Sequence, residues 1–164
     1  MRIVRFALNG LVQYGLVEHD RLYPCDGTPF GELLPKADAI DMQSVTLLAP
    51  VCPPNVICLG LNYRKHADEV GLPYPTEPLL FMKASTSVCG PSDPIVLPAH
   101  SPDSIDHEAE LAIVIGRQVR NIPEGEAADA ILGYTIANDV SDRAAQFSDG
   151  QWMRAKSYDT FCPL

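Results

Sequence analysis

The sequence predicts a mostly β protein with short helices, an α+β fold, and three observations lead to this prediction. The chain has 15 prolines in 164 residues, which mark many turns and favour short strands over a helical bundle. Its apolar runs are short and are bounded by Gly, Pro, Asn or Asp, as strands usually are. Three prolines fall between Pro50 and Pro54, which predicts a linker between a small strand-rich N-terminal domain, residues 1–50, and a second domain, residues 55–164.

The first local element is a hairpin. Ile3–Leu8 and Leu11–Val17 are two strand-like runs that flank Asn9-Gly10, the dipeptide that supplies the positive φ angles of a type I′ turn. Further strands are predicted at residues 21–24 and 45–48, and nothing in this domain has the pattern of a catalytic motif.

The second domain begins with a strand at Asn55–Leu59, followed by a short helix. Asn62 is a suitable N-cap for this helix, and Gly71 is a suitable residue to end it. Within the helix, His66 and Glu69 are spaced i and i+3, close enough to pair, and a carboxylate beside an imidazole prepares a general base. The alternative interpretation is an ordinary charged helix surface, which the spacing alone favours.

Two apolar runs follow, Leu79–Lys83 and Ile95–Leu97, and both are predicted to be strands. The central strand comes next. Glu108 and Glu110 precede or begin it, and because residues at i and i+2 share a face of a strand, both carboxylates point the same way, about 6.6 Å apart. Apolar residues alternate on both sides of this strand, which predicts that both of its faces are buried.

A third carboxylate, Asp139, ends the next predicted strand, Ile131–Val140, after a short helix around residues 121–130. Three carboxylates that converge away from water repel one another, and a divalent cation would remove that repulsion. Oxygen ligands favour Mg²⁺ or Mn²⁺, with Ca²⁺ as a third option, and disfavour zinc. The alternative is that Glu108 and Glu110 form the solvated edge of an amphipathic strand.

Composition and charge limit the partners and the cellular compartment that we expect for this chain. The formal net charge of −9 would repel a nucleic acid or an anionic membrane, so neither is expected as a partner. No run approaches the roughly 18 apolar residues that span a bilayer, and the start of the chain lacks a signal-peptide core. The five cysteines include no C-x-x-C pair, which indicates reduced thiols and a cytoplasmic protein.

Five segments of residues 55–164, taken in order, resemble the fumarylacetoacetate hydrolase family. They are Gly60-Leu61-Asn62-Tyr63 with His66 and Glu69, Glu77-Pro78 to Lys83, His107-Glu108-Ala109-Glu110-Leu111, Asn138-Asp139-Val140-Ser141, and Gln151-Trp152 to Lys156-Ser157-Tyr158-Asp159-Thr160. Residues 1–50 resemble the small N-terminal domain that many members carry. The resemblance implies a distorted β roll of mixed sheets and a homodimer.

The same resemblance implies the site. It implies Mg²⁺ or Mn²⁺ held by Glu108, Glu110 and Asp139, and a His66 and Glu69 dyad on a segment that orders over the substrate as a lid. Lys156 matches the family lysine that reaches the substrate. Three more residues fall in stretches that line the family pocket: Lys83, Arg143 and Gln146.

Family substrates are acylpyruvates, diketo acids and related oxo acids, so the resemblance implies a small anionic oxo acid as substrate. The first expectation is hydrolysis of a carbon–carbon bond through a metal-stabilised enolate, with water activated by His66. One alternative is decarboxylation, or isomerisation of the 2-hydroxyhepta-2,4-diene-1,7-dioate type, on the same scaffold. A second alternative is a non-catalytic module, because the apolar end at Phe161–Leu164 and the lack of a later family loop suggest a C-terminally truncated chain.

Overall fold

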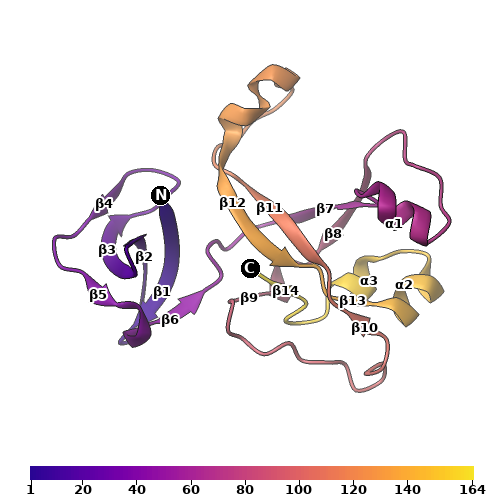
Figure 1. Ribbon diagram of the computed structural model, residues 1–164, viewed down its shortest axis with the longest axis horizontal. Helices are drawn as coiled ribbons and strands as arrows, with labels where there is room; N and C mark the ends of the chain where they lie inside the picture. Colours follow the sequence, from indigo (N-terminus) through magenta and orange to yellow (C-terminus); the bar gives the residue numbers. More distant parts are fainter.

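The computed structural model describes residues 1–164 and confirms a mostly β fold with short helices (Figure 1). Residues before Pro50 form one antiparallel sheet with the strand order β4-β3-β2-β1-β6, and β5 pairs with β3. Its strands are β1 (Arg2–Leu8), β2 (Leu11–Glu18), β3 (Arg21–Gly27), β4 (Leu33–Pro35), β5 (Ile40–Asp41) and β6 (Thr46–Leu48), with a 3-10 turn, η1 (Met42–Ser44), before β6.

The predicted hairpin is confirmed at the start of this sheet. Leu8 pairs with Leu11, and the two residues between them have the positive φ angles of the predicted turn, 50° at Asn9 and 80° at Gly10. The strands curl around a small core of Phe6, Val17 and Leu22.

The rest of the chain forms four two-stranded sheets and short helices, which Figure 1 shows to one side of the N-terminal sheet. The strand pairs are β7 (Val56–Gly60) with β8 (Leu79–Lys83), β9 (Val88–Cys89) with β14 (Cys162–Pro163), β10 (Ile105–Asp106) with β13 (Ser141–Asp142), and β11 (Ala109–Ile115) with β12 (Ile131–Asn138). The helical elements are α1 (Arg64–Glu69), η2 (Ser85–Ser87), η3 (Glu124–Ala130), α2 (Arg143–Asp149) and α3 (Met153–Lys156). The β9–β14 pair is parallel and the other three pairs are antiparallel.

Two local predictions were wrong. Helix α1 begins at Arg64 with Tyr63 at its N-cap position and no side-chain cap, so Asn62 is not the N-cap. The run Ile95–Leu97 is not a strand, because prolines at positions 94 and 98 flank it and the Val96 amide donates to Thr160 Oγ1 at 2.8 Å instead. Gly71 does follow the helix end, with φ of 67°.

The central strand β11 is not buried on both faces, contrary to prediction. Leu111, Ile113 and Ile115 are 64%, 53% and 55% exposed, whereas Glu110, Ala112 and Val114 are half-buried. The reason is that β11 pairs only with β12, and no other element of the chain covers the face that carries Leu111. The expected helix between the two strands is the 3-10 helix η3, which Figure 1 shows at the tip of the β11–β12 hairpin.

Helix α3 is placed by an aromatic contact. The Trp152 ring meets Phe81 of β8 edge to face, with ring centroids 5.4 Å apart. Gly60 at the end of β7 leaves room for the same indole, since a Cβ there would lie 2.7 Å from Trp152 Cζ3. This packing sets Lys156, at the end of α3, beside β8.

No helix of this structure has the length and apolar character needed to cross a membrane. All five cysteines are free thiols.

Candidate active site

The backbone of the β11–β12 pair brings two of the predicted carboxylates together. Ala109 pairs with Asn138 in the strand register, so the residues just outside the pair, Glu108 and Asp139, are neighbours. The Asp139 amide donates to the Glu108 carbonyl oxygen at 2.9 Å, and the Glu108 amide donates to Asn138 Oδ1 at 3.0 Å. The start of one strand and the end of the next are therefore fixed to each other.

Two buried lysines converge on Asp139. Lys83 Nζ lies 2.6 Å from Asp139 Oδ1, and Lys156 Nζ lies 2.6 Å from Asp139 Oδ2. The exposed fractions are 2% for each lysine and 6% for the aspartate. Lys83 closes β8 and Lys156 closes α3, so three separate elements meet at this carboxylate. The two predicted lysines thus contact one predicted metal ligand.

Glu108 lies beside this cluster and has several partners. Lys156 Nζ is 3.1 Å from Glu108 Oε1, Arg143 Nη2 is 2.8 Å from the same oxygen, and Ser141 Oγ donates to it at 3.0 Å. Burial alone would raise the pKa of the Glu108 carboxyl, but Lys156, Arg143 and Ser141 together hold it below its ordinary value. Glu108 is therefore ionised at neutral pH.

Glu110 is the carboxylate of the three that lacks compensation. Its side chain makes no hydrogen bond or ion pair in the structure and is half-buried. Burial raises the pKa of Glu110, and so do the negative charges of Glu108 and Asp139, against smaller opposing effects of Lys156 and His66. The negative charges of Glu108 and Asp139 therefore act on the carboxyl group of Glu110.

The two predicted site residues on α1, His66 and Glu69, do not bind each other in the structure. The structure contains no hydrogen bond or ion pair between His66 and Glu69, and Glu69 is exposed. His66 is half-buried and lies near enough to Glu110 to lower the pKa of that carboxyl. The pairing of His66 with Glu69 stays a prediction, whereas His66 does lie on the side of the carboxylates.

Arg143 and Gln146, both on α2, contact each other. Arg143 Nη1 donates to Gln146 Oε1 at 2.8 Å, and Arg143 Nε donates to Asp106 Oδ2 at 2.8 Å while Nη2 binds Glu108. The guanidinium therefore links the helix, β10 and the carboxylate group. The backbone of Arg143 is also anchored, because its amide donates to the Ser104 carbonyl oxygen at 2.8 Å.

Sequence reasoning missed Asp142, the N-cap residue of α2. Its Oδ1 accepts from Ser104 Oγ at 2.8 Å, from Ser101 Oγ at 3.1 Å and from the Ala145 amide at 3.1 Å, so it caps the helix and holds the preceding loop. Burial opposes its ionisation, but these donors hold the pKa of Asp142 below its ordinary value. The available signal was an Asp directly before a helical segment, the usual N-cap type.

The residues fit a divalent cation by their chemistry. Glu108, Glu110 and Asp139 carry three negative charges against the two ammonium groups of Lys83 and Lys156, and Arg143 shares its charge with Asp106, so negative charge is in excess. Lys156 Nζ lies between Glu108 and Asp139 and marks a place where positive charge is stable. No three Asp, Glu, His or Cys side chains are close enough to form a ready coordination shell in this structure. The metal ligands stay a prediction, and its basis is this donor set.

A groove of about 510 Å³ opens onto these groups. Glu110, Asp139 and Lys83 lie along it, and the rest of its wall is mainly apolar. Cys58 also lines the groove. Burial, and to a smaller extent the negative charge of Asp139, raises the pKa of this thiol to about 12, so Cys58 is not a nucleophile at neutral pH. The groove supplies space for a small ligand beside the carboxylates and lysines.

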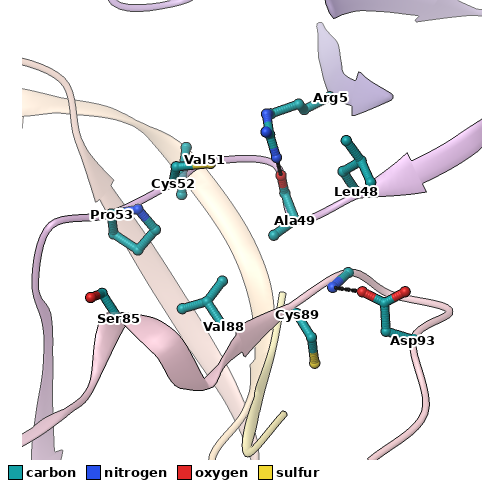
Figure 2. Close-up of a pocket in the computed structure, with 11 residues that line it drawn as sticks. Arg5, Leu48, Ala49, Val51, Cys52, Pro53, Ser85, Val88, Cys89 and Asp93 are labelled. Atoms are coloured by element: carbon teal, nitrogen blue, oxygen red, sulfur yellow. Dashed lines mark hydrogen bonds between the residues drawn. The ribbon is translucent and has the colours of Figure 1, made fainter. Parts of the chain in front are cut away.

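A second cavity, of about 330 Å³, lies between the N-terminal sheet, the linker and β9 (Figure 2). Figure 2 shows the Arg5 guanidinium directed at the Ala49 carbonyl oxygen, which it meets at 3.4 Å. The Gly90 amide donates to Asp93 Oδ2 at 2.7 Å. None of the predicted site residues lines this cavity, so the carboxylate groove is the candidate site.

Comparison with known protein families gives two matches that follow one another along the chain. Residues 55–164 match the fumarylacetoacetate hydrolase C-terminal model, and residues 1–50 match the Rv2993c-like N-terminal model. The first match covers every carboxylate, lysine and arginine described at the site.

Several relatives are similar over most of the chain. An uncharacterised protein of Archaeoglobus fulgidus is 48% identical over 161 residues, which are 98% of this chain and 60% of that protein. The oxaloacetate tautomerase of Xenopus laevis is 46% identical over 128 residues, 76% of this chain and 40% of that protein. The 2,4-didehydro-3-deoxy-L-rhamnonate hydrolase of a Sphingomonas species is 48% identical over 110 residues, 66% of this chain and 38% of that protein.

The fold is shared with solved structures. The crystal structure of 5-carboxymethyl-2-hydroxymuconate delta-isomerase from Mycobacterium smegmatis matches with a TM-score of 0.89 and 43% identity, covering 99% of this chain and 64% of that one. The chain thus spans less than two thirds of the length of these relatives. With its two domain matches and these relatives, the chain belongs to the fumarylacetoacetate hydrolase family, in the form that carries an Rv2993c-like N-terminal domain.

Proposed function

We propose that the site acts on a small 2-oxo acid and interconverts its keto and enol forms, or moves a double bond through the same enolate. One observation carries this proposal: two buried lysines meet at one carboxylate on the wall of a groove that also holds an uncompensated glutamate. Cations that are already fixed and shielded from water stabilise a negative charge that develops next to them. An enolate and a substrate carboxylate are charges of that kind.

The roles of the chain's own residues follow from their positions. Glu108, Glu110 and Asp139 would hold Mg²⁺ or Mn²⁺, and such an ion, when bound, supplies Lewis-acid stabilisation of the substrate's oxygens. Lys83, which lies on the groove and binds Asp139, contributes positive charge beside the place of the substrate's carboxylate. Arg143 keeps Glu108 ionised and in place.

His66 is the residue that would carry the proton. Its imidazole is half-buried near Glu110, and histidine is the side chain that most often transfers protons in catalysis. A ring nitrogen takes the proton from the carbon beside the carbonyl group and returns it to the enolate oxygen or to another carbon. No water has to attack in this sequence, so the proposal does not require His66 to pair with Glu69.

The names of two relatives support isomerisation: a tautomerase of oxaloacetate and a delta-isomerase of a hydroxymuconate. Hydrolysis is the second candidate, because another relative is a hydrolase of a 2,4-didehydro-3-deoxy sugar acid. In that case His66, assisted by Glu69, would activate water. We place it second because these two side chains share no hydrogen bond or ion pair in the structure.

The proposal is tested by incubating the purified chain with Mn²⁺ and oxaloacetate, or an acylpyruvate, in D₂O. Keto–enol exchange gives deuterium at the carbon beside the carbonyl group and a loss of enol absorbance, faster than Mn²⁺ alone produces. With an acylpyruvate, release of pyruvate and a second acid would show hydrolysis instead, and with oxaloacetate, release of CO₂ faster than Mn²⁺ alone produces would show decarboxylation. Lys83→Met should abolish the exchange and Lys36→Met, at an exposed ion pair with Asp26, should preserve it. Exchange no faster than with free Mn²⁺ would contradict the proposal.

A further inference from the structure

The two lysines that meet at Asp139 come from elements that depend on other contacts for their positions. Lys83 is the last residue of β8, and β8 pairs only with β7. Lys156 is the last residue of α3, which has four residues. A helix of one turn is not stable by itself in water, because its nucleation costs more than its few hydrogen bonds return. The place of the Lys156 ammonium group is therefore set by the contacts that fix α3 to β8.

One hydrogen bond joins these two elements directly beside both lysines. The Ala84 amide donates to Ser157 Oγ at 2.9 Å. Ala84 follows Lys83, where the β7–β8 ladder ends, so its amide lies outside the hydrogen bonds of that sheet. Ser157 follows Lys156 and is the C-cap residue of α3. Because Ala84 is half-buried, its amide would lose stability without the hydroxyl group as its acceptor.

The other contacts between α3 and β8 fix their relative position less tightly. The Trp152 and Phe81 rings meet edge to face, with centroids 5.4 Å apart, and Lys156 Nζ lies 5.1 Å from the centroid of the Phe81 ring. Aromatic and cation–π contacts tolerate small displacements, whereas a hydrogen bond weakens steeply as its length and angle change. The hydrogen bond between Ala84 and Ser157 therefore fixes the separation of the two segments most closely.

We propose that Ser157 is a positioning residue, whose hydroxyl group sets the spacing of the Lys83 and Lys156 ammonium groups around Asp139. Both ammonium groups lie 2.6 Å from this carboxylate, one at each oxygen. Each lysine is one residue away from the hydrogen bond between Ala84 and Ser157. A shift of α3 relative to β8 therefore moves the two ammonium groups apart, and Asp139 can no longer hold both at this length. Ser157 itself does not line the groove, so it acts through the lysines.

The consequence for the reaction rests on the proposed function, in which fixed cations stabilise a developing negative charge. Such cations are effective because they are in place before the reaction begins, and a displacement of about 1 Å can lower a rate about 100-fold. Loss of the Ser157 hydroxyl group should therefore lower kcat. KM should change little, because the weakened interaction is one made in the transition state while the groove keeps its shape.

The first test measures stability and needs no activity. Ser157→Ala and Lys156→Met are made singly and together, and urea unfolding gives the equilibrium constants of unfolding. If the hydroxyl group positions Lys156, the lysine substitution should cost less when the hydroxyl group is already absent, so the combined effect should fall at least fivefold short of the product of the single effects. The control is Ser87→Ala. Ser87 Oγ donates to the carbonyl oxygen of the same Ala84 at 2.7 Å and makes no hydrogen bond to α3, so its effect should multiply with that of Lys156→Met to within twofold.

The second test measures keto–enol exchange of oxaloacetate with Mn²⁺, on variants that circular dichroism shows to be folded. Ser157→Ala should lower kcat at least tenfold and change KM less than twofold. Ser157→Thr keeps the hydroxyl group and should recover most of the rate, and Ser87→Ala should retain the full rate. If Ser157→Ala does not fold, Ser157→Cys takes its place in both tests, because a thiol is a weaker acceptor.

Two results would overturn the inference: independent effects of Ser157→Ala and Lys156→Met on stability, or a rate of Ser157→Ala equal to that of Ser87→Ala. Failure of the proposed function has a different sign, which is that the unaltered chain exchanges no faster than free Mn²⁺. In that case the coupling measured in urea decides by itself whether Ser157 positions Lys156.

Discussion

Lys83 and Asp139 form an ion pair that is almost completely buried, with Nζ and Oδ1 2.6 Å apart and side-chain exposed fractions of 1% and 7%. Lys83 Nζ also donates to the Val140 carbonyl oxygen at 3.1 Å. The pair joins the end of β8 to the end of β12, and Lys156 completes it from α3. The same contact therefore holds the fold together and places positive charge at the site.

Lys83→Met should destabilise the chain strongly. Removal of one partner of a buried ion pair leaves the other charge uncompensated, which costs about 3 to 5 kcal/mol, and the remaining Lys156 should keep the loss near the lower figure. Urea unfolding followed by circular dichroism measures it. Lys36→Met breaks an ion pair whose side chains are 49% and 73% exposed, so it should cost less than about 1 kcal/mol. Equal losses of unfolding free energy in the two variants would show that the buried ion pair stabilises the fold no more than the exposed one.

Asp142→Ala should loosen the loop before β10 and the start of α2. Loss of an N-cap costs about 1 kcal/mol, and the hydroxyl groups of Ser101 and Ser104 lose their shared acceptor as well. Asp142→Asn keeps an acceptor oxygen and should retain most of the stability. Hydrogen exchange of residues 101–105 and 143–146 should accelerate in the alanine variant only. Unchanged exchange in both segments would contradict the role of Asp142 as the joint between them.

Gly60→Ala should disturb the aromatic contact that places α3. A Cβ at this position would lie 2.7 Å from the Trp152 ring, so the indole must shift, and overpacking of this kind costs about 1 to 3 kcal/mol. Trp152 is the single tryptophan, so its fluorescence spectrum reports the shift directly. Gly125→Ala, where the Cβ would meet no atom within 4 Å, is the control and should leave spectrum and stability unchanged.

The pH dependence of stability should differ between the two glutamates. The pKa of Glu108 is lowered on folding, so its ionised form stabilises the fold above its unfolded-state pKa, and this stability is lost as the pH falls through the folded value. The pKa of Glu110 is raised, so it favours the fold below its unfolded-state pKa, and that contribution is lost as the pH rises through the folded value. Glu110→Gln should therefore stabilise the metal-free chain at pH 7, and Glu108→Gln should destabilise it. Thermal unfolding of both variants at pH 4 and pH 7 checks the signs.

Features of this structure that depend only on residues adjacent along the chain could be predicted from the sequence. Asn9-Gly10 fixes its hairpin because the turn conformation is a property of those two residues. The approach of Glu108 to Asp139 also followed, since both lie at strand ends. The exposed face of β11 could not be predicted, because apolar alternation does not reveal whether another element covers it. The Ile95–Leu97 run has a strand-like composition, but its neighbouring prolines and Thr160, 64 residues from Val96, decide its conformation.

The sharing of Asp139 by two lysines was beyond sequence reasoning for a related reason. The two lysines lie at the ends of separate elements, and only the packing of β8 and α3 brings them to one carboxylate. The resemblance to the family indicated these residues as a set, but not their contacts. Asp142 was missed because its role lies in the loop that it holds and not in a motif.

Thermal unfolding with and without Mn²⁺, on the unaltered chain and on Glu110→Gln, tests most directly whether Glu108, Glu110 and Asp139 hold a metal ion. At a concentration 100 times its dissociation constant, a ligand of the folded state adds about 2.7 kcal/mol of stability. We predict that Mn²⁺ raises the melting temperature of the unaltered chain and leaves that of Glu110→Gln unchanged. A cooperative transition of the unaltered chain that does not respond to Mn²⁺, or an equal response of the variant, would contradict it.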